Sequence, residues 1–551
     1  MPAPPIPQVT LQEYEKQPLR LLHSVVDYWA ALRPGDAAIV NATRGTRVTW
    51  EELRRGSLAV AAGLARLGFR KGDVLAAWLP LLDEHILLEY GCFRLGVIHA
   101  PLDLRLQPAE LRRCVEAVGA KGLAFLGKMG ALDFAAVVPR DLVEHLIQFS
   151  PRGECIPGAR SFAELVGVGH ARPLRVGERV DETDGAQVIF TTGSTGSPKP
   201  ALLSHRGILC QNLCLALAFR FGPDQRVLCN LPASHVGGQA EVLMTTLFAG
   251  GTAVTLETFD PVKSLDAIER HGVALVGQIP AMFQLEWRTA DYAARNFAGL
   301  QTAVYGGQSA PRAFLEQMLR MAPRIATGLG LTETSGFCTY IALTPDADAV
   351  AQGVGWAMPA YRMSVRHAME GGAAGAEVAD GEIGHICFEG PQNFLGYLND
   401  PAATADTLSS DGVLYTGDMG RVDQRGLHLA GRAKWVLKPA GYQVFPGDVE
   451  AHFAGLTERV ASVGVVGHPH AVWTEGIVAF VEKRAGAGLS AAELRRHARS
   501  LTSYMRPLHY VILEPGGMPL NRTAKVDITR LQEMAREEVR KLRERGRWDA
   551  A

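Results

Sequence analysis

The sequence predicts an α/β fold in which helices alternate with the strands of a largely parallel sheet, followed by a compact α+β lobe. The chain has 551 residues, which exceeds a single core and suggests about three or four structural units. Apolar residues make up 47% and charged residues 21%, so large cores can be buried. The pattern changes after about Gly431, which places the lobe there.

The first third of the chain shows the alternation most clearly. Thr49, with Glu52 three residues later, predicts the capped start of a helix that runs to Gly68. The apolar run that follows predicts a buried parallel strand. The next expected elements are a strand at 74–79, a helix through Tyr90 and Phe93, and a strand at 96–101.

Strands and helices also alternate later in the chain. Strands are expected at 251–256 and 273–277 around a helix at Pro261–Arg270, whereas 121–180 is read only as mixed. The C-terminal lobe should hold strands at 460–467 and 477–483 and helices at 490–500 and 527–545.

Several functional classes are disfavoured. The formal net charge of −1 argues against a binder of polyanions along its whole length. No apolar run is long enough for a bilayer, and the N-terminus lacks the order of a secretion signal. The eight cysteines include no CxxC pair, so Cys210 and Cys214 are expected to be buried thiols. A cytoplasmic protein is predicted.

One loop carries the sharpest chemical signal. The segment from Ile189 to Lys199 reads as an apolar strand followed by glycines, hydroxyl side chains and one lysine. Inward-turned amides, hydroxyls and an ammonium can surround a polyphosphate. The spacing of Gly193 and Gly196 is not that of a Walker loop. A flexible turn is the alternative, and the loop alone does not decide between them.

Four further segments bear on this choice. Glu333, beside the glycine turn 328–330, could hold Mg²⁺ on phosphate oxygens. Asp418 could accept both ribose hydroxyls, and 431–434 supplies cations. Lys525 lies in a loop just before the last helix. Each has an ordinary reading as a surface turn or a solvated side chain.

Together and in this order, the segments resemble the adenylate-forming superfamily of acyl-CoA synthetases, peptide-synthetase adenylation domains and beetle luciferases. The match runs from about Thr49 to Lys525. The resemblance implies a large N-terminal domain of layered mixed α/β sheets with a β-barrel-like subdomain, and a small mobile α+β C-terminal domain. The implied boundaries are 1–430, a hinge at 431–434, and 435–551.

The resemblance also implies residue roles. Lys525 would bridge the substrate carboxylate and the α-phosphate, Glu333 would hold Mg²⁺, and Lys434 would be the hinge residue. Asp418 and Arg432 would bind ribose. The other implied contacts are Thr191, Thr192, Gly193, Ser194, Thr195, Gly196 and Lys199 with the β- and γ-phosphates; Thr332 with the α-phosphate; Gly306, Gly307, Gln308, Gly328, Leu329 and Gly330 around the nucleotide and acyl pocket; His235 at the pocket entrance; and Lys438, Gly441 and Tyr442 in the mobile domain, beside the pantetheine tunnel.

The implied activity is an ATP-dependent acid–CoA ligase. A carboxylic acid and ATP would give acyl-AMP and pyrophosphate, and coenzyme A would then give acyl-CoA and AMP, with Mg²⁺ as cofactor. Three positions depart from the family pattern: Pro200 replaces a glycine, Leu329 an adenine-stacking aromatic residue, and Ala524 a glycine. Because no charged group is lost, both half-reactions are expected.

The acid itself is predicted only by class. Amino-acid activators carry an aspartate near this histidine, but no acidic residue lies between Leu231 and Gln239. The small residues near the pocket leave room for a bulky apolar tail, whether aryl, alicyclic or medium-chain acyl. Segment 306–311 faintly resembles aryl-type ligases such as succinylbenzoate–CoA ligase.

Other interpretations remain open. The acyl group could pass to the phosphopantetheine of a carrier protein instead of coenzyme A. A non-catalytic nucleotide-binding relative and a luciferase-like oxygenase are further alternatives. A monomer or a homodimer is expected, with no nucleic-acid partner.

Overall fold

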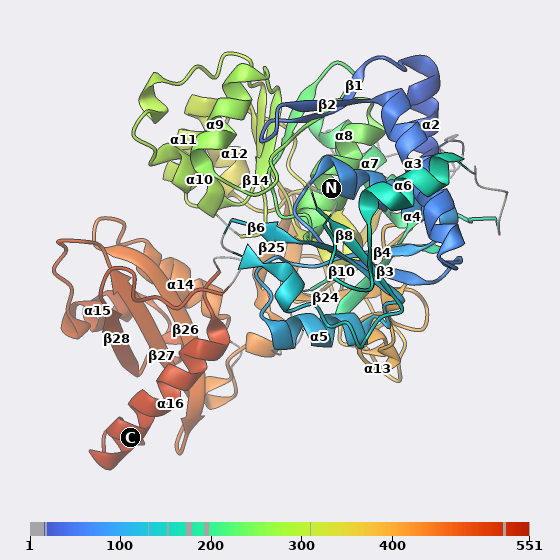
Figure 1. The fold of residues 1–551 in the computed structure, drawn as a ribbon. Coiled ribbons are helices and arrows are strands. Elements are labelled where there is room, and N and C mark those ends of the chain that lie inside the picture. The colour runs from blue at the N-terminus through green and yellow to red at the C-terminus, as the bar shows by residue number, and fades with distance from the viewer. Residues whose placement is uncertain are drawn as a thin grey trace.

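The computed structural model describes residues 16, 19–130, 132–150, 154–171, 179–191, 198–308, 310–442, 444–521 and 525–549. Figure 1 shows a large N-terminal domain and, beside it, a separate small lobe that contains α14, α15, α16 and β26–β28. The predicted two-part α/β organisation is therefore confirmed.

Two large sheets form the frame of the N-terminal domain. Each is mainly parallel, and each ends in antiparallel strands at one edge. The first sheet has the order β16 (Ile325–Thr327), β15 (Thr302–Tyr305), β14 (Leu275–Gln278), β12 (Arg226–Cys229), β13 (Thr252–Thr255), β1 (Ala37–Asn41) and β2 (Thr46–Thr49). The second has the order β23 (Gly396–Tyr397), β11 (Pro200–Ser204), β10 (Gly185–Phe190), β4 (Ile98–Pro101), β3 (Val74–Trp78), β5 (Gly122–Leu126), β8 (His145–Phe149) and β9 (Ala159–Ser161).

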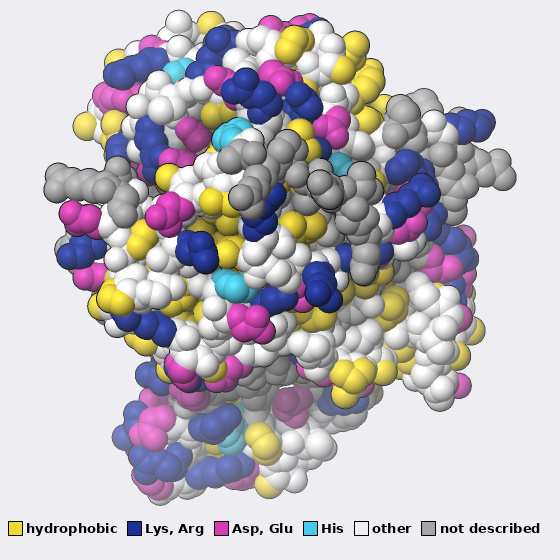
Figure 2. All heavy atoms as spheres, turned by 45° about the vertical axis from the view of Figure 1, so that its right-hand side comes forward, with side chains coloured by type: hydrophobic (Ala, Val, Ile, Leu, Met, Phe, Trp, Pro, Cys, Tyr) yellow, Lys and Arg dark blue, Asp and Glu magenta, His cyan; other side chains and the backbone are white. Residues whose placement is uncertain are grey.

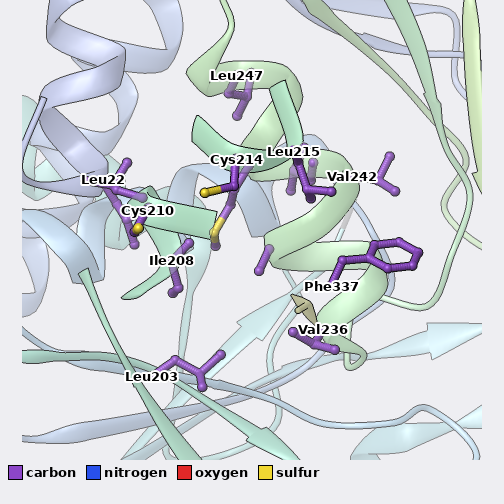
Figure 3. Close-up of a cluster of buried hydrophobic side chains, with 14 of the residues drawn as sticks. Leu22, Leu203, Ile208, Cys210, Cys214, Leu215, Val236, Val242, Leu247 and Phe337 are labelled. Atoms are coloured by element: carbon purple, nitrogen blue, oxygen red, sulfur yellow. The ribbon is translucent and has the colours of Figure 1, made fainter. Parts of the chain in front are cut away.

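Helices fill the space between the two sheets and cover their outer faces. One core cluster joins Ile189 and Leu203 of the second sheet to Val227 and Ala253 of the first, through helices between them. Figure 3 shows part of this cluster, including Cys210 and Cys214. The central helices are α2 (Leu22–Leu32), α4 (Asp83–Leu95), α7 (His205–Phe219), α8 (Thr245–Phe248) and a π-helical segment, Gly237–Met244.

Two further core clusters lie on the outer faces of the two sheets. One packs the second sheet against α3 (Trp50–Arg66), α5 (Pro108–Ala117) and α6 (Phe162–Ala171). The other packs the first sheet against α9 (Pro261–Arg270), α10 (Pro280–Trp287), α11 (Arg312–Met321) and α12 (Ala347–Ala351). The predicted start of α3 is confirmed, because Thr49 and Glu52 form a reciprocal capping box.

A third sheet of the N-terminal domain corresponds to the expected barrel-like subdomain. It is antiparallel and consists of β21 (Arg362–Arg366), β22 (Gly384–Glu389), β24 (Leu414–Asp423) and β25 (Gly426–Arg432). The small helix α13 (Pro401–Ala405) precedes β24. Short two-stranded pairs are β6 (Lys128–Met129) with β7 (Leu132–Asp133), β17 (Gly330–Leu331) with β18 (Gly336–Phe337), and β19 (Thr339–Tyr340) with β20 (Trp356–Ala357).

The C-terminal lobe has its own core. Strands β26 (Val460–His470), β27 (Thr474–Lys483) and β28 (His509–Leu513) form a sheet covered by α14 (Pro446–Ala454), α15 (Ala491–His497) and α16 (Ile528–Glu544). Asp527 caps the start of α16, as the sequence suggests. No helix in the part of the chain described is long and apolar enough to cross a membrane.

Candidate active site

The predicted phosphate loop connects two antiparallel strands, β10 and β11. The Thr191 N–H donates to the Lys199 carbonyl at 2.9 Å, which closes the base of the loop. Pro200 is buried at the start of β11. The predicted phosphate contacts Thr192, Gly193, Ser194, Thr195 and Gly196 lie outside the described residues. The two flanking residues place the loop between the ends of these strands.

Tyr397 brings Lys199 and Glu333 together. The tyrosine lies on β23, next to β11, and its Oη donates to Glu333 Oε1 at 2.5 Å. The Lys199 Nζ lies 4.9 Å from the centre of the same ring, within the range of a cation–π contact. Burial and the Glu333 carboxylate raise the pKa of Tyr397, so its hydroxyl stays protonated. An ammonium and a carboxylate are thus held on opposite parts of one side chain.

Asp418 and Arg432 are directly opposite each other on β24 and β25. The Asp418 Oδ1 lies 2.7 Å from the Arg432 Nε, whereas Oδ2 is buried and has no hydrogen-bond partner among the described residues. Burial raises the pKa of Asp418, against the opposing effect of Arg432 and Lys525. A buried acceptor without a donor is costly. A ribose hydroxyl would supply the missing donor, so these residues fit a nucleotide.

Lys525 joins this group from the C-terminal lobe. Its backbone pairs with Asn521, whose N–H donates to the Lys525 carbonyl at 2.7 Å. Burial, and then the charge of Arg432, lower the pKa of Lys525, whereas Asp418 raises it. The residue is exposed at the surface, close enough to Arg432 and Asp418 for their charges to act on its ammonium. Lys525 of the C-terminal lobe therefore lies near Asp418 and Arg432 of the N-terminal domain.

Lys434 adds a further cation. It is exposed, and its Nζ lies 4.9 Å from the centre of the Trp435 ring. Its pKa is lowered by burial and then by the charges of Arg432 and Lys199. Residues of the predicted hinge and the predicted phosphate loop are therefore close enough to repel each other. An anion placed among them would relieve this repulsion.

His235 lies near Lys525. Its ring is exposed by area, yet the surrounding protein and the charge of Lys525 lower its pKa to about 4. The Gly237 N–H donates to Nδ1 at 3.2 Å. The neutral ring therefore carries its proton on Nε2, which can donate a hydrogen bond.

The glycine segments lie at strand ends, as expected. Gly306 follows β15, and a Cβ there would approach the Phe337 ring to 2.9 Å. Gly307, with φ of +91°, and Gln308 are exposed. A Cβ at Gly328 would lie 2.0 Å from the Thr339 carbonyl, so close packing requires this glycine. Leu329 packs partly against the central core, and Gly330 is exposed.

The remaining predicted residues make contacts within the C-terminal lobe. The Lys438 N–H donates to Glu475 Oε2 at 2.5 Å. Tyr442 is 56% exposed and stacks on Tyr504, with ring centres 4.4 Å apart. Gly441 ends a short 3₁₀ turn, Pro439–Gly441. The structure does not bring these three residues to the Asp418–Lys525 group.

The side chains near Glu333 suit a magnesium ion that is held partly by protein and partly by substrate phosphates. In the described part of the chain, no cluster of three or more His, Cys, Asp or Glu side chains could hold a metal alone. Mg²⁺ commonly uses one or two carboxylates together with substrate phosphates. The half-buried Glu333, next to Thr332 and near Lys199, offers one such carboxylate.

Two polar residues of this region were missed by sequence reasoning. Tyr397 reaches Glu333 only because β23 pairs with β11, and no sequence signal predicts that pairing. Glu241 lies six residues after His235, just beyond the segment searched for acidic residues. A search over the full helix after His235 would have found it.

Comparison with known proteins agrees with this geometry. The sequence model of the "AMP-binding enzyme" family matches residues 26–398, and that of the "AMP-binding enzyme C-terminal domain" matches 448–525. The first match covers more than half of the chain. The chain belongs to the AMP-binding enzymes.

Three proteins illustrate its similarity to other AMP-binding enzymes. A Mycobacterium tuberculosis (strain ATCC 25618 / H37Rv) CoA ligase, named for a methyl-dioxo-octahydroindenyl propanoyl group, is 28% identical, covering 94% of this chain and 99% of its own. The fatty acid–acyl-carrier-protein ligase ScoC of Streptomyces coeruleorubidus is 28% identical, covering 92% and 95%. ATP-bound MatB from Rhodopseudomonas palustris is 25% identical, with a TM-score of 0.78, covering 92% and 98%.

These findings confirm the resemblance to the adenylate-forming superfamily and the α/β fold. They also confirm, at the level of the family, an AMP-forming acid–CoA ligase that uses ATP, Mg²⁺ and coenzyme A.

Proposed function

We propose that this enzyme activates a carboxylic acid with a bulky apolar tail in the recess between its two domains. The observation that carries the proposal is the group formed by Lys525, Arg432 and the unpartnered Asp418 oxygen. One lysine of the small domain lies beside a nucleotide-binding pair of the large domain. That arrangement suits the adenylation step.

In the first step, an oxygen of the acid attacks the α-phosphorus of ATP, and the bond to pyrophosphate breaks. Anionic groups must approach one another, so cations have to offset their repulsion. Lys525 would bridge the carboxylate and the α-phosphate, and Lys199 would contact the outer phosphates. Asp418 and Arg432 would hold the ribose. Bound at Glu333, Mg²⁺ would supply further positive charge to the phosphate oxygens.

In the second step, a thiol attacks the carbonyl carbon of acyl-AMP, and AMP leaves. We propose that the C-terminal domain, 435–551, rotates about the hinge at 431–434 relative to the domain of residues 1–430. Rotation would withdraw Lys525 and present Lys438, Gly441 and Tyr442 to the pantetheine arm. Tyr442 is exposed and stacks on Tyr504 of its own lobe. This is consistent with a role for Tyr442 in a second arrangement of the two domains.

The acceptor and the acid are proposed by class. The neutral His235 and the exposed Gly307 and Gly330 leave space at the pocket entrance for an aryl, alicyclic or medium-chain acid. Free coenzyme A is the favoured acceptor, since the Mycobacterium tuberculosis relative, which matches this chain over nearly its full length, is named as a CoA ligase. The carrier-protein relative supports phosphopantetheine on a carrier as the second candidate.

The test is a panel of aryl, alicyclic and straight-chain acids assayed for pyrophosphate release with ATP and Mg²⁺. We expect release with at least one ring-bearing acid, and formation of the CoA thioester with release of AMP when free coenzyme A is added. Thioester formation with a carrier protein alone would favour the second candidate. If no acid gave pyrophosphate release, the proposal would be overturned in favour of a non-catalytic nucleotide binder.

The cellular setting is also proposed. All eight cysteines are free, and seven are buried, which is typical of a reducing compartment, so we propose a cytoplasmic location. Figure 2 shows a face on which basic and acidic side chains are interspersed, which fits small-molecule substrates better than a nucleic-acid partner. A monomer or a homodimer would serve this chemistry equally, because every named residue comes from one chain.

A further inference from the structure

Glu241 places a carboxyl group beside the recess that contains His235. It lies in the π-helical segment Gly237–Met244, and such segments are rare and often occur at functional sites. Figure 3 shows Val242 of this segment, with Val236 and Phe337 nearby. Glu241 Oε2 lies 3.2 Å from the position that a Cβ would take at Gly237, and His235 Nδ1 lies 3.3 Å from that same position. The carboxyl and the imidazole therefore flank one glycine.

Two more glycines leave room for this carboxyl. Glu241 Oε1 lies 3.2 Å from the position of a Cβ at Gly330 and 2.8 Å from that of a Cβ at Gly336. Gly336 has a φ of +126°, a conformation that favours glycine. The sequence suggests that these small residues leave space for an apolar tail. The structure places a carboxyl group within part of that space.

The carboxyl has one strong internal partner. The Phe337 backbone N–H donates to it. Glu241 is half-buried, so part of its side chain is open to solvent. Burial raises its pKa to about 7, against the opposing effect of the Phe337 hydrogen bond. Near neutral pH, a large fraction of the group is therefore uncharged and can donate as well as accept hydrogen bonds.

Gln211 adds an unpaired donor at the same point. Its amide oxygen accepts from Asn212 Nδ2 at 3.1 Å. Its Nε2 is buried, finds no hydrogen-bond partner in the part of the chain that the structure describes, and lies 2.8 Å from the position of a Cβ at Gly336. The side chain is 0% exposed. Two polar groups thus converge on Gly336 from α7 and from the π-helical segment.

We infer that Glu241 recognises an uncharged oxygen substituent, either a hydroxyl or a keto group, on the tail of the acid. The inference rests on the proposed use of this recess as the acyl pocket. A wholly apolar tail would displace water from the carboxyl and leave it without an outer partner, which is unfavourable. A hydroxyl can donate to the carboxyl or accept from it, and a keto oxygen can accept from its protonated form.

A cationic tail suits this site less well. An ammonium group is bound best by a fully ionised carboxylate with several supporting charges, whereas the surroundings of Glu241 favour its neutral form. The nearby Lys525 is itself a cation close to His235. The substrate class is therefore a carboxylic acid whose tail carries an uncharged oxygen function.

The test compares matched acids on the full-length enzyme. Phenylpropanoic acid is paired with its ring-hydroxylated derivatives, and cyclohexylpropanoic acid with its ring-oxo derivatives, each substituent placed at every ring position. The kcat/KM for pyrophosphate release is measured for the wild type, Glu241→Gln and Glu241→Leu. Glu316→Leu, on the exposed face of α11, is the matched control.

We expect the wild type and the control to prefer at least one oxygen-bearing acid over its parent by about tenfold or more. Glu241→Gln should keep part of this preference, and Glu241→Leu should reduce it to within about twofold while improving use of the parent acid. The hydroxyl and keto arms identify which oxygen function is bound. Unchanged thermal unfolding and ATP binding in the variants exclude a general loss of structure.

Two results would count against the inference, and they are distinguishable. If the wild type uses the parent acids and shows the same ratios as Glu241→Leu, the role of Glu241 is wrong while the proposed ligase stands. If the wild type releases pyrophosphate with none of the acids, the proposed function fails and the inference fails with it.

Discussion

Tyr397 is the residue whose role depends most on long-range folding. Its hydroxyl donates to Glu333, and its ring faces the Lys199 ammonium, so it acts as a positioning residue for both. A hydrogen bond to a charged group contributes about 1.5–3 kcal/mol. We expect Tyr397→Phe to lower kcat/KM for adenylation by about tenfold or more, and to raise the Mg²⁺ concentration needed for half-maximal rate.

The Mg²⁺ titration separates this role from general destabilisation. Tyr510→Phe, which changes a buried tyrosine in the C-terminal lobe, is the control and should leave the Mg²⁺ dependence unchanged. If Tyr397→Phe shifted only the unfolding temperature, the contact with Glu333 would be structural and nothing more.

A second residue-scale prediction concerns the buried carboxyl of Glu89. Gln187 Nε2 donates to it at 2.7 Å, and burial raises its pKa to about 8 from an ordinary value of 4.5. A raised pKa means that the folded state binds the proton more tightly than the unfolded state. The associated stability is complete below about pH 4.5 and is lost as the pH rises through about 8.

Glu89→Gln removes this titration while keeping the shape of the side chain. We expect the unfolding temperature of the variant to rise relative to the wild type as the pH is raised from 5 to 9, on the order of 1 kcal/mol of relative stability per pH unit within the window. Thermal unfolding at several pH values measures it. A difference that stays constant with pH would show that Glu89 does not titrate there.

Among the elements, helix boundaries were the most predictable. Thr49 Oγ1 accepts from the Glu52 N–H at 3.2 Å, and Glu52 Oε2 accepts from the Thr49 N–H at 2.8 Å. Thr49→Ala should lower the free energy of unfolding by about 1 kcal/mol. It should also lower the unfolding temperature of the N-terminal domain by about 1–2 °C. Differential scanning calorimetry measures the change. Thr49→Ser keeps the acceptor oxygen and should stay within error of the wild type; an equal loss in both variants would argue against the cap.

Helix caps can be predicted from the sequence because they depend on residues within one turn of each other. The same locality explains why the helices expected at Pro261–Arg270 and 527–545 are found close to those positions, as α9 and α16. Strand partners are not local. The hydrophobic pattern predicted strands at 74–79 and 251–256 but did not divide them between two sheets, and it left 121–180 as mixed although β5 and β8 lie there.

The candidate site shows the same division between local and distant information. Lys199, Glu333, Asp418 and Lys525 were found because each lies in a motif of a few residues. The contacts that relate them, such as the pairing of Asp418 with Arg432 and the bridge through Tyr397, depend on strand register. Glu241 lies two residues beyond the segment between Leu231 and Gln239, and its approach to Gly330 and Gly336 depends on the fold.

At the scale of the whole molecule, the arrangement of the two domains decides which half-reaction is possible. Lys525 is close enough to Asp418 and Arg432 for their charges to affect its pKa, whereas Tyr442 stacks within its own lobe. This arrangement suits adenylation. If one recess serves both steps, the residue needed for the first step must leave before the thiol arrives.

Lys525→Ala tests this sequence of events. We expect adenylate formation to fall by at least about a hundredfold, since the variant loses a charge that acts on the transition state. Thioester formation from a supplied acyl-adenylate and coenzyme A should stay within about twofold of wild type, because the proposed rotation withdraws Lys525 in that step. The two half-reactions are measured separately, by pyrophosphate exchange and by thioester yield, with Lys541→Ala on the exposed face of α16 as control. Equal loss of both steps would contradict rotation of the small domain, and would mean that Lys525 stays in the recess throughout turnover.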